Sequence, residues 1–229
     1  MATTISSGRA NSPKKLANIA DHGVIYGGRG LVFDGVVDYV DLASLKFSLD
    51  NYPSGAVSFW FYTENADVGA SAQQIFSARN STTNTRLYMQ LVDNGLMNFT
   101  LGSATDEVGD LAYSANQWNY VVLTWGSDVG TIYMNGEKHS NTISPMDVVA
   151  TGSTSFGCVI GAYSNSVDSN LFEGKVSDFK LFNTSLTEAQ VQELYLKPEQ
   201  SAPLAVRDNL VAWYPMCEGN PDSPQSVVY

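Results

Sequence analysis

The stretch Gln117-Trp-Asn-Tyr-Val-Val-Leu-Thr-Trp-Gly-Ser-Asp-Val-Gly-Thr-Ile-Tyr-Met-Asn-Gly-Glu-Lys138 decides the fold class. Within 118–125 only Asn119 and Thr124 are polar, and the valines and aromatic residues favour a strand that is buried on both faces. Asn135-Gly136 then permits the positive φ angles of a tight turn. The stretch therefore predicts a β-hairpin, and a strand covered on both faces needs two packed layers, as in a sandwich.

Short strands separated by turn signals continue on both sides of this hairpin, at intervals of roughly 8–12 residues. Residues 56–63 alternate cleanly, so that one face must be core and the other is aromatic enough to be covered or to bind a ligand. One helix is predicted by the capping box Thr187-Glu-Ala-Gln190, and Pro198 ends it. The sequence thus predicts an all-β fold, an antiparallel two-sheet sandwich with one short C-terminal helix.

Charge is spread unevenly along the chain, whose formal net charge is −11. Residues 1–30 hold four basic residues and one acidic residue, so they carry +3 and the rest carries −14. A basic arm that includes Arg9, Lys14 and Lys15 can dock on a neighbouring subunit or another acidic surface, or can be an unpaired terminus. The body's scattered basic residues argue against a nucleic-acid partner. No apolar run reaches the roughly 18–20 residues of a transmembrane helix, so we expect no membrane insertion.

Composition divides the chain into three parts. Residues 1–23, rich in small polar residues, form a basic arm or linker, and residues 24–197 hold the sandwich and its helix. Residues 198–229 begin as a linker and continue with a new strand near Asn209, which suggests the opening of a further element. Cys158 and Cys217 match no disulfide framework or metal-ligand spacing, so we expect two free thiols.

Several motifs occur together in one order. They are Leu31-Val-Phe-Asp-Gly35, Val57-Ser-Phe-Trp60, Trp118-Asn-Tyr-Val-Val-Leu-Thr124, Ile132-Tyr-Met-Asn-Gly-Glu137 and the segment 172–191. In this order they resemble the laminin-G-like, concanavalin A-like jelly-roll domains, over about residues 24–197. The resemblance implies two curved antiparallel sheets with a terminal helix, in agreement with the strand pattern.

Domains of this family often open with a strand of the type Leu-Val-Ala-Trp-Tyr-Pro, which in this chain occurs at 210–215 instead. Either a second copy of the sandwich begins there, or the strand completes a sheet in the first domain or in a neighbouring chain. Trp213 and Tyr214 of this strand are therefore candidate assembly residues.

The resemblance also implies a calcium site, because members of the family often carry an ion that braces the fold. The matching positions are Asp34 and Asp178, and carboxylate oxygens are suitable calcium ligands. The alternative is that each aspartate caps its own tight turn.

Trp60, Tyr62, Tyr88, Tyr113 and Tyr163 are candidate stacking faces for sugar rings, although aromatic residues at alternating positions in a sandwich are usually core or cover. Glucan-cleaving enzymes of this fold use the spacing Glu-x-Asp-x-x-Glu, which the chain lacks, and neither histidine stands in a convincing serine triad. We therefore expect no enzyme, and glycoside hydrolysis is only a distant third hypothesis.

The favoured hypothesis is a virion surface protein, such as a bacteriophage fibre, tail or capsid-decorating protein. A lectin-like fold usually meets its ligand outside a cell, yet the sequence shows no export signal. Particles that assemble in the cytoplasm and leave by lysis resolve this conflict. The expected partners are other virion subunits or a host glycan, and we expect a homo-oligomer. The alternative is an exported glycan-binding adhesion module at the cell surface.

Overall fold

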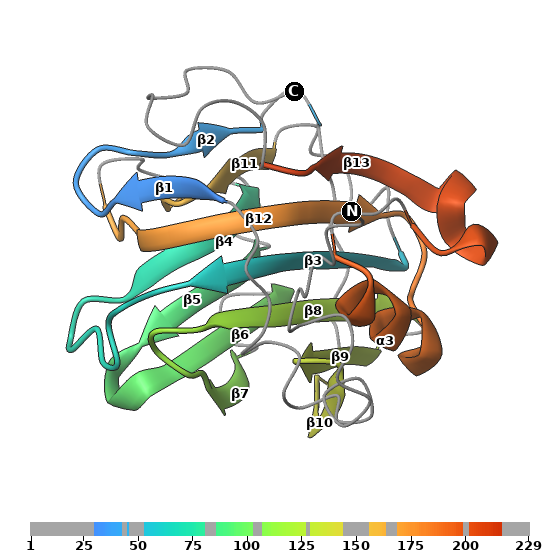
Figure 1. The fold of residues 1–229 in the computed structure, drawn as a ribbon, viewed down its shortest axis with the longest axis horizontal. Helices are drawn as coiled ribbons and strands as arrows, with labels where there is room; N and C mark the ends of the chain where they lie inside the picture. Colours follow the sequence, from blue (N-terminus) through green and yellow to red (C-terminus); the bar gives the residue numbers. More distant parts are fainter. Residues whose placement is uncertain are drawn as a thin grey trace, which may run out of the picture.

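The computed structural model describes residues 30–42, 45, 53–80, 86–102, 107–126, 129–143, 156–163, 169–198 and 202–216. Its strands form two antiparallel sheets that pack face to face (Figure 1). This confirms the predicted all-β sandwich with one short helix. The predicted arm, with Arg9, Lys14 and Lys15, lies outside the described residues, as does Cys217.

Sheet A has seven strands and sheet B has six. In sheet A the order is β1 (Leu31–Asp34), β12 (Glu173–Phe182), β3 (Gly55–Tyr62), β8 (Trp118–Gly126), β9 (Val129–Met134) and β10 (Glu137–Ile143), and β13 (Leu210–Tyr214) pairs with β12. In sheet B the order is β2 (Val40–Asp41), β11 (Phe156–Ile160), β4 (Gln73–Asn80), β5 (Arg86–Val92), β6 (Leu96–Gly102) and β7 (Glu107–Ala112). The described helical segments are α3 (Glu188–Leu196) and the 3-10 turns η3 (Asp93–Gly95) and η4 (Leu204–Asn209).

Strand β8 lies in the middle of sheet A, between β3 and β9, and its residues 118–125 are all buried. The predicted two-sided burial is therefore confirmed. Its inner face enters the core between the sheets, where Phe179 of β12 meets Phe59 of the same sheet and Phe76 of sheet B, with ring centroids 6.2 and 5.2 Å away. Such aromatic contacts join the two sheets across the core.

The outer face of sheet A, which points away from sheet B, is only partly covered. Helix α3 packs Val191, Leu194 and Tyr195 onto it, and the ring of Tyr195 stacks on Trp60 at 5.4 Å. The helix begins with the predicted capping box, in which Thr187 and Gln190 bind each other's backbone N–H groups. Figure 1 shows α3 over one side of the sheet, and of the described helices none lies over the far ends of β1, β12 and β3.

Strand β13 completes sheet A. Residues 173–176 of β12 pair with β1, residues 179–182 pair with β13, and β3 occupies the opposite edge of β12. Of the alternatives for this strand, the structure shows the one in which it completes a sheet of the first domain, because β13 pairs with the part of β12 that β1 leaves unpaired. That a further element opens in residues 198–229 stays a prediction. The described sandwich extends to Met216 rather than ending at residue 197.

No helix in the described part of the chain is long and apolar enough to cross a membrane.

Candidate functional site

Asp34, one of the two predicted calcium ligands, caps its own turn. Its Oδ1 atom accepts hydrogen bonds from the backbone N–H groups of Val36 (2.8 Å), Val37 (2.9 Å) and Asp38 (3.2 Å). These hydrogen bonds lower the pKa of the exposed Asp34 carboxyl, and the bond from Val37 has the largest effect. The arrangement is that of an aspartate turn.

Asp178, the second predicted ligand, lies far along β12 from Asp34. The β1–β12 register places Asp34 opposite Glu173, five residues from Asp178, which corresponds to about 16 Å along a strand. Asp178 is buried and accepts from Lys180 Nζ and from Trp213 Nε1 (2.8 Å). The structure does not bring the two carboxylates together, so one ion cannot bind both. Among the described residues, no three acidic, histidine or cysteine side chains gather as a metal site.

Three of the predicted stacking residues are buried: Trp60, Tyr113 and, on sheet B, Tyr88. Trp60 lies under α3 between Tyr120 and Tyr195. The ring of Tyr113 packs against Phe61 at 6.1 Å, its hydroxyl donates to the backbone oxygen of Asn65, and burial raises its pKa. None of the three rings presents a face to solvent, so the expectation that they stack on sugars is corrected.

Tyr62 lies where the cover of sheet A ends. The registers of four strands place Val32, Lys175, Tyr62 and Trp118 in one row across the outer face. Val32 is 60% exposed, and Lys175 Nζ lies 5.0 Å from the centre of the Tyr62 ring. Trp118 supports the ring from the other side at 5.9 Å. Trp118 is buried and belongs to the cluster under α3, whereas Tyr62, Lys175 and Val32 are partly or fully exposed along this row.

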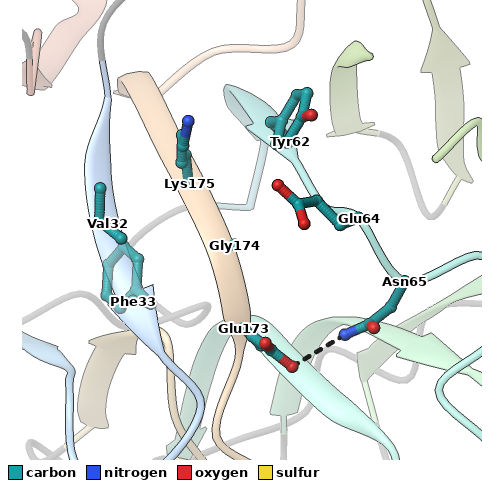
Figure 2. Close-up of a pocket in the computed structure, with 8 residues that line it drawn as sticks. All are labelled: Val32, Phe33, Tyr62, Glu64, Asn65, Glu173, Gly174 and Lys175. Carbon is teal, nitrogen blue, oxygen red and sulfur yellow. Dashed lines mark hydrogen bonds between the residues drawn. The ribbon is translucent and has the colours of Figure 1, made fainter. Parts of the chain in front are cut away.

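A hollow of about 190 Å³ opens beside this row. It is lined by Val32, Phe33, Tyr62, Glu64, Asn65, Glu173, Gly174 and Lys175. Figure 2 shows the Glu64 carboxylate pointing from the end of β3 toward β12, while Asn65 Nδ2 donates to Glu173 Oε2 at 3.0 Å.

Gly174 keeps the middle of the hollow open. It has φ = +154°, and a Cβ atom at this position would lie 2.3 Å from the backbone oxygen of Tyr62. A larger residue would therefore push β12 away from β3 and change the shape of the hollow.

The lining of the hollow combines two aromatic residues and one aliphatic side chain with one cation, one amide and two carboxylates. Apolar faces with a few converging polar groups are typical of small-ligand sites. Sequence reasoning found Tyr62 but missed Glu64, Asn65, Glu173 and Lys175. Glu173 and Lys175 alternate on a predicted strand, and this pattern could have indicated that both face the same side of a sheet. The sequence does not show which residues of β3 they would face.

Tyr88 and the last predicted stacking residue, Tyr163, come together on the outer face of sheet B. Their ring centroids are 5.5 Å apart with an interplanar angle of 63°. Tyr88 is only 3% exposed, whereas Tyr163 is partly exposed. Two arginines that the sequence reasoning missed, Arg79 and Arg86, lie against these rings.

The candidate assembly residues Trp213 and Tyr214 are placed within the sandwich. The indole N–H of Trp213 donates to Asp178, and Tyr214 packs on Phe179 with centroids 6.3 Å apart. Both residues thus hold β13 against β12 of the same chain.

Residues 34–192 match the model of the concanavalin A-like lectin/glucanases superfamily, in its laminin G type. The chain belongs to this superfamily, as the motif resemblance predicted. A search of curated protein sequences finds no match.

Several solved structures share the fold. The CBM40 of the Ruminococcus gnavus IT-sialidase is 14% identical, with a TM-score of 0.56 over 74% of this chain and 97% of that chain. The Trypanosoma rangeli sialidase is 16% identical (TM-score 0.55), and the NanB sialidase from Streptococcus pneumoniae is 18% identical (TM-score 0.54). These matches cover 73% and 72% of this chain but only 27% of each sialidase. At such identities the likeness shows the fold alone.

Proposed function

We propose that the sandwich is a non-catalytic glycan-binding module whose site is the hollow beside Tyr62. The observation that carries the proposal is the convergence of aromatic, cationic, amide and carboxylate side chains on an open hollow. The likeness to the R. gnavus CBM40, which has been solved bound to α2,3-sialyllactose, supports it, since 96% of that module is covered.

Each lining residue has a role that a sugar can use. The Tyr62 ring and the Val32 side chain offer apolar contacts to the C–H face of a pyranose. Lys175 donates hydrogen bonds to hydroxyl oxygens and Glu64 accepts from hydroxyl groups. The bond between Asn65 and Glu173 fixes both side chains before the ligand arrives, which reduces the entropy lost on binding.

The two carboxylates of the hollow do not form the pair that glycoside hydrolysis requires. A glycosidase needs one carboxyl kept protonated as general acid, usually by burial in an apolar pocket. Glu64 and Glu173 are both exposed, and Glu173 already accepts a hydrogen bond from Asn65. The arrangement therefore favours binding over catalysis.

A glycan array of the 229-residue protein tests this proposal. We expect selective binding by the wild type, at least a tenfold loss of affinity in Tyr62→Ala, and no loss in the matched control Tyr39→Ala, whose tyrosine is 45% exposed away from the hollow. Equal binding by wild type and Tyr62→Ala, or silence on the array, would contradict it. Repeating the array with calcium and with EDTA tests whether binding depends on calcium, as the resemblance implied for Asp34 and Asp178.

As the setting of this module we propose the surface of a virion, in a fibre, tail or capsid-decorating homo-oligomer with other virion subunits as partners. The contrast between the basic residues 1–30 and the acidic remainder supports this setting. So do the exposed valines Val36 and Val37 in the turn after β1, at 68% and 67% exposure. An exported adhesion module is the alternative.

Deleting residues 1–23 separates the two settings. A virion component should lose incorporation into particles while its isolated sandwich still binds the same glycan. A deletion of the 13 residues 217–229 at the other end of the chain serves as the control for loss of a terminal segment. Unchanged incorporation without the arm would favour the adhesion module, and light scattering of the purified protein would show whether it is an oligomer.

A further inference from the structure

The outer face of sheet B holds a pair of like charges in register. Arg79 of β4 lies directly opposite Arg86 of β5. Two glycines complete this row, Gly157 of β11 next to Arg79 and Gly102 of β6 next to Arg86. Like charges directly opposite each other destabilise a sheet, so this row needs a compensating interaction.

Each guanidinium lies against a tyrosine ring. Arg79 is 5.8 Å from the centre of the Tyr163 ring, and its Nη1 atom donates to the Tyr163 hydroxyl at 2.8 Å. Arg86 is 5.4 Å from the centre of the Tyr88 ring. Because the two rings also contact each other, all four side chains form one cluster. The tyrosines orient both guanidinium groups but supply no negative charge.

Arg86 has a buried donor that lacks an acceptor. Its Nε atom is buried and has no hydrogen-bond partner. Within the described residues Arg86 forms no ion pair, and the described pairs, Lys180–Asp178 and Lys197–Glu193, lie elsewhere. A buried donor without an acceptor is costly. Burial, followed by the Tyr163 hydroxyl, raises the pKa of Tyr88, so its hydroxyl stays neutral and can donate.

We propose that Arg79 and Arg86 bind a carboxylate carried by an acidic sugar. A carboxylate matches the planar fork of a guanidinium through two parallel hydrogen bonds. The flanking glycines carry no side chains that would block its approach, and both arginines are partly exposed.

A row of hydrogen-bonded amides lies on the same face and holds one partly exposed member. Gln74, Gln90 and Asn98 lie opposite one another on β4, β5 and β6, and they share Tyr88's side of the sheet. Gln74 donates to Gln90, which donates to Asn98 at 3.4 Å. Gln74 and Asn98 are buried, so the partly exposed Gln90 is the amide that can donate to and accept from a sugar hydroxyl. The site is on the sheet opposite the Tyr62 hollow, so it stands independently of the proposed function.

Isothermal titration of the full chain tests the site with paired probes. The acids are N-acetylneuraminic acid and glucuronic acid, and their methyl esters are the uncharged partners. We expect each acid that fits to bind at least tenfold more tightly than its ester, and the affinity to fall as salt screens the charges. Arg86→Gln should lower the affinity for the acid at least tenfold. Arg207→Gln, which removes an exposed arginine elsewhere, should bind the acid like the wild type.

Further variants keep the outcome unambiguous. Arg86→Lys preserves the charge but not the fork, so it should fold like the wild type by circular dichroism and still bind more weakly. Tyr62→Ala should leave acid binding intact, which separates this site from the hollow. Equal affinity for acid and ester, absence of binding by every acid, or an equal loss in Arg207→Gln would each overturn the proposal.

Discussion

Strand β12 carries two lysines on the same outer face of sheet A, and their surroundings differ. Lys175 pairs in register with Tyr62 and Lys180 with Ser58, which lie on one side of β3. Each ammonium group lies over an aromatic ring, 5.0 Å from that of Tyr62 and 5.3 Å from that of Trp213. Lys175 is exposed, whereas Lys180 is only 1% exposed. The same residue type lines a hollow in one half of the strand and a closed structural cluster in the other.

The two lysines differ because α3 and β13 pack over only the second half of β12. In the second half of β12, α3 and β13 exclude water, so a charge there needs a partner. A bulge between Ser177 and Lys180 and the left-handed φ of +53° at Asp178 allow the carboxylate to meet Lys180 and Trp213. Within the described part of the chain no helix lies above the first half of the strand, and the polar side chains there line the hollow.

The largest loss of stability is expected when the buried ion pair of Asp178 and Lys180 is broken. Asp178→Ala leaves Lys180 buried without its carboxylate and should lower the free energy of unfolding by about 3–5 kcal/mol. The matched change in the open half, Lys175→Ala, should stay within about 0.5 kcal/mol of the wild type while it weakens glycan binding. Urea unfolding of both variants measures the contrast, and similar losses would refute it.

A double variant sharpens this result. Asp178→Leu with Lys180→Met removes both charges, so it should be more stable than either single variant. A simple sum of the two single losses would show that the pair is not coupled.

The next largest loss of stability is expected in β13, which pairs with the second half of β12. Trp213→Phe keeps a ring over Lys180 but removes the N–H that donates to Asp178, which should cost about 1–3 kcal/mol. Thermal unfolding followed by circular dichroism measures the loss. Binding at the hollow should be unchanged, and a wild-type melting temperature would argue against the role of β13.

Removing the N-cap of α3 should lower the free energy of unfolding by less. Thr187→Ala removes the hydroxyl that accepts from the Gln190 N–H and should cost about 1 kcal/mol. Hydrogen exchange should increase in α3 and in the β3 segment beneath it, while exchange around Tyr62 stays the same. Uniform acceleration would show that α3 does not act as a local cover.

The smallest expected effect is a loss of stability that appears only at alkaline pH. Burial raises the pKa of Tyr120, which lies beneath α3. Because the unfolded state ionises first, near pH 10, the tyrosine's contribution is complete below that pH and is lost as pH rises further. Urea unfolding between pH 8 and 11 should show this decline, and Tyr120→Phe should reduce it. The exposed-site control Tyr39→Phe should follow the wild type.

The sequence predicts those parts of the molecule that depend on neighbouring residues. The apolar run of β8 predicts its central place, and the pattern from Thr187 to Gln190 predicts the helix cap. Trp60 and Tyr62, by contrast, are two residues apart on one face and look alike in the sequence. They differ only because α3 covers Trp60, and the position of that helix depends on packing between distant segments.

The hollow was harder to predict for the same reason. Asn65 and Glu173 are 108 residues apart and meet because β3 and β12 pair in one register, which bulges modify. The placement of β13 likewise depends on the edge that the short strand β1 leaves open. Neither the register nor the open edge can be derived from local patterns.

The most direct test of the central claim is an amide NMR titration of the isotope-labelled protein with the best saccharide from the array. The account predicts saturable shifts for Tyr62, Asn65 and Gly174, at the hollow, and none for residues 179–182 under the cover. Shifts restricted to the covered half or to other surfaces, with the hollow silent, would contradict the assignment of the glycan site to the uncovered end of sheet A.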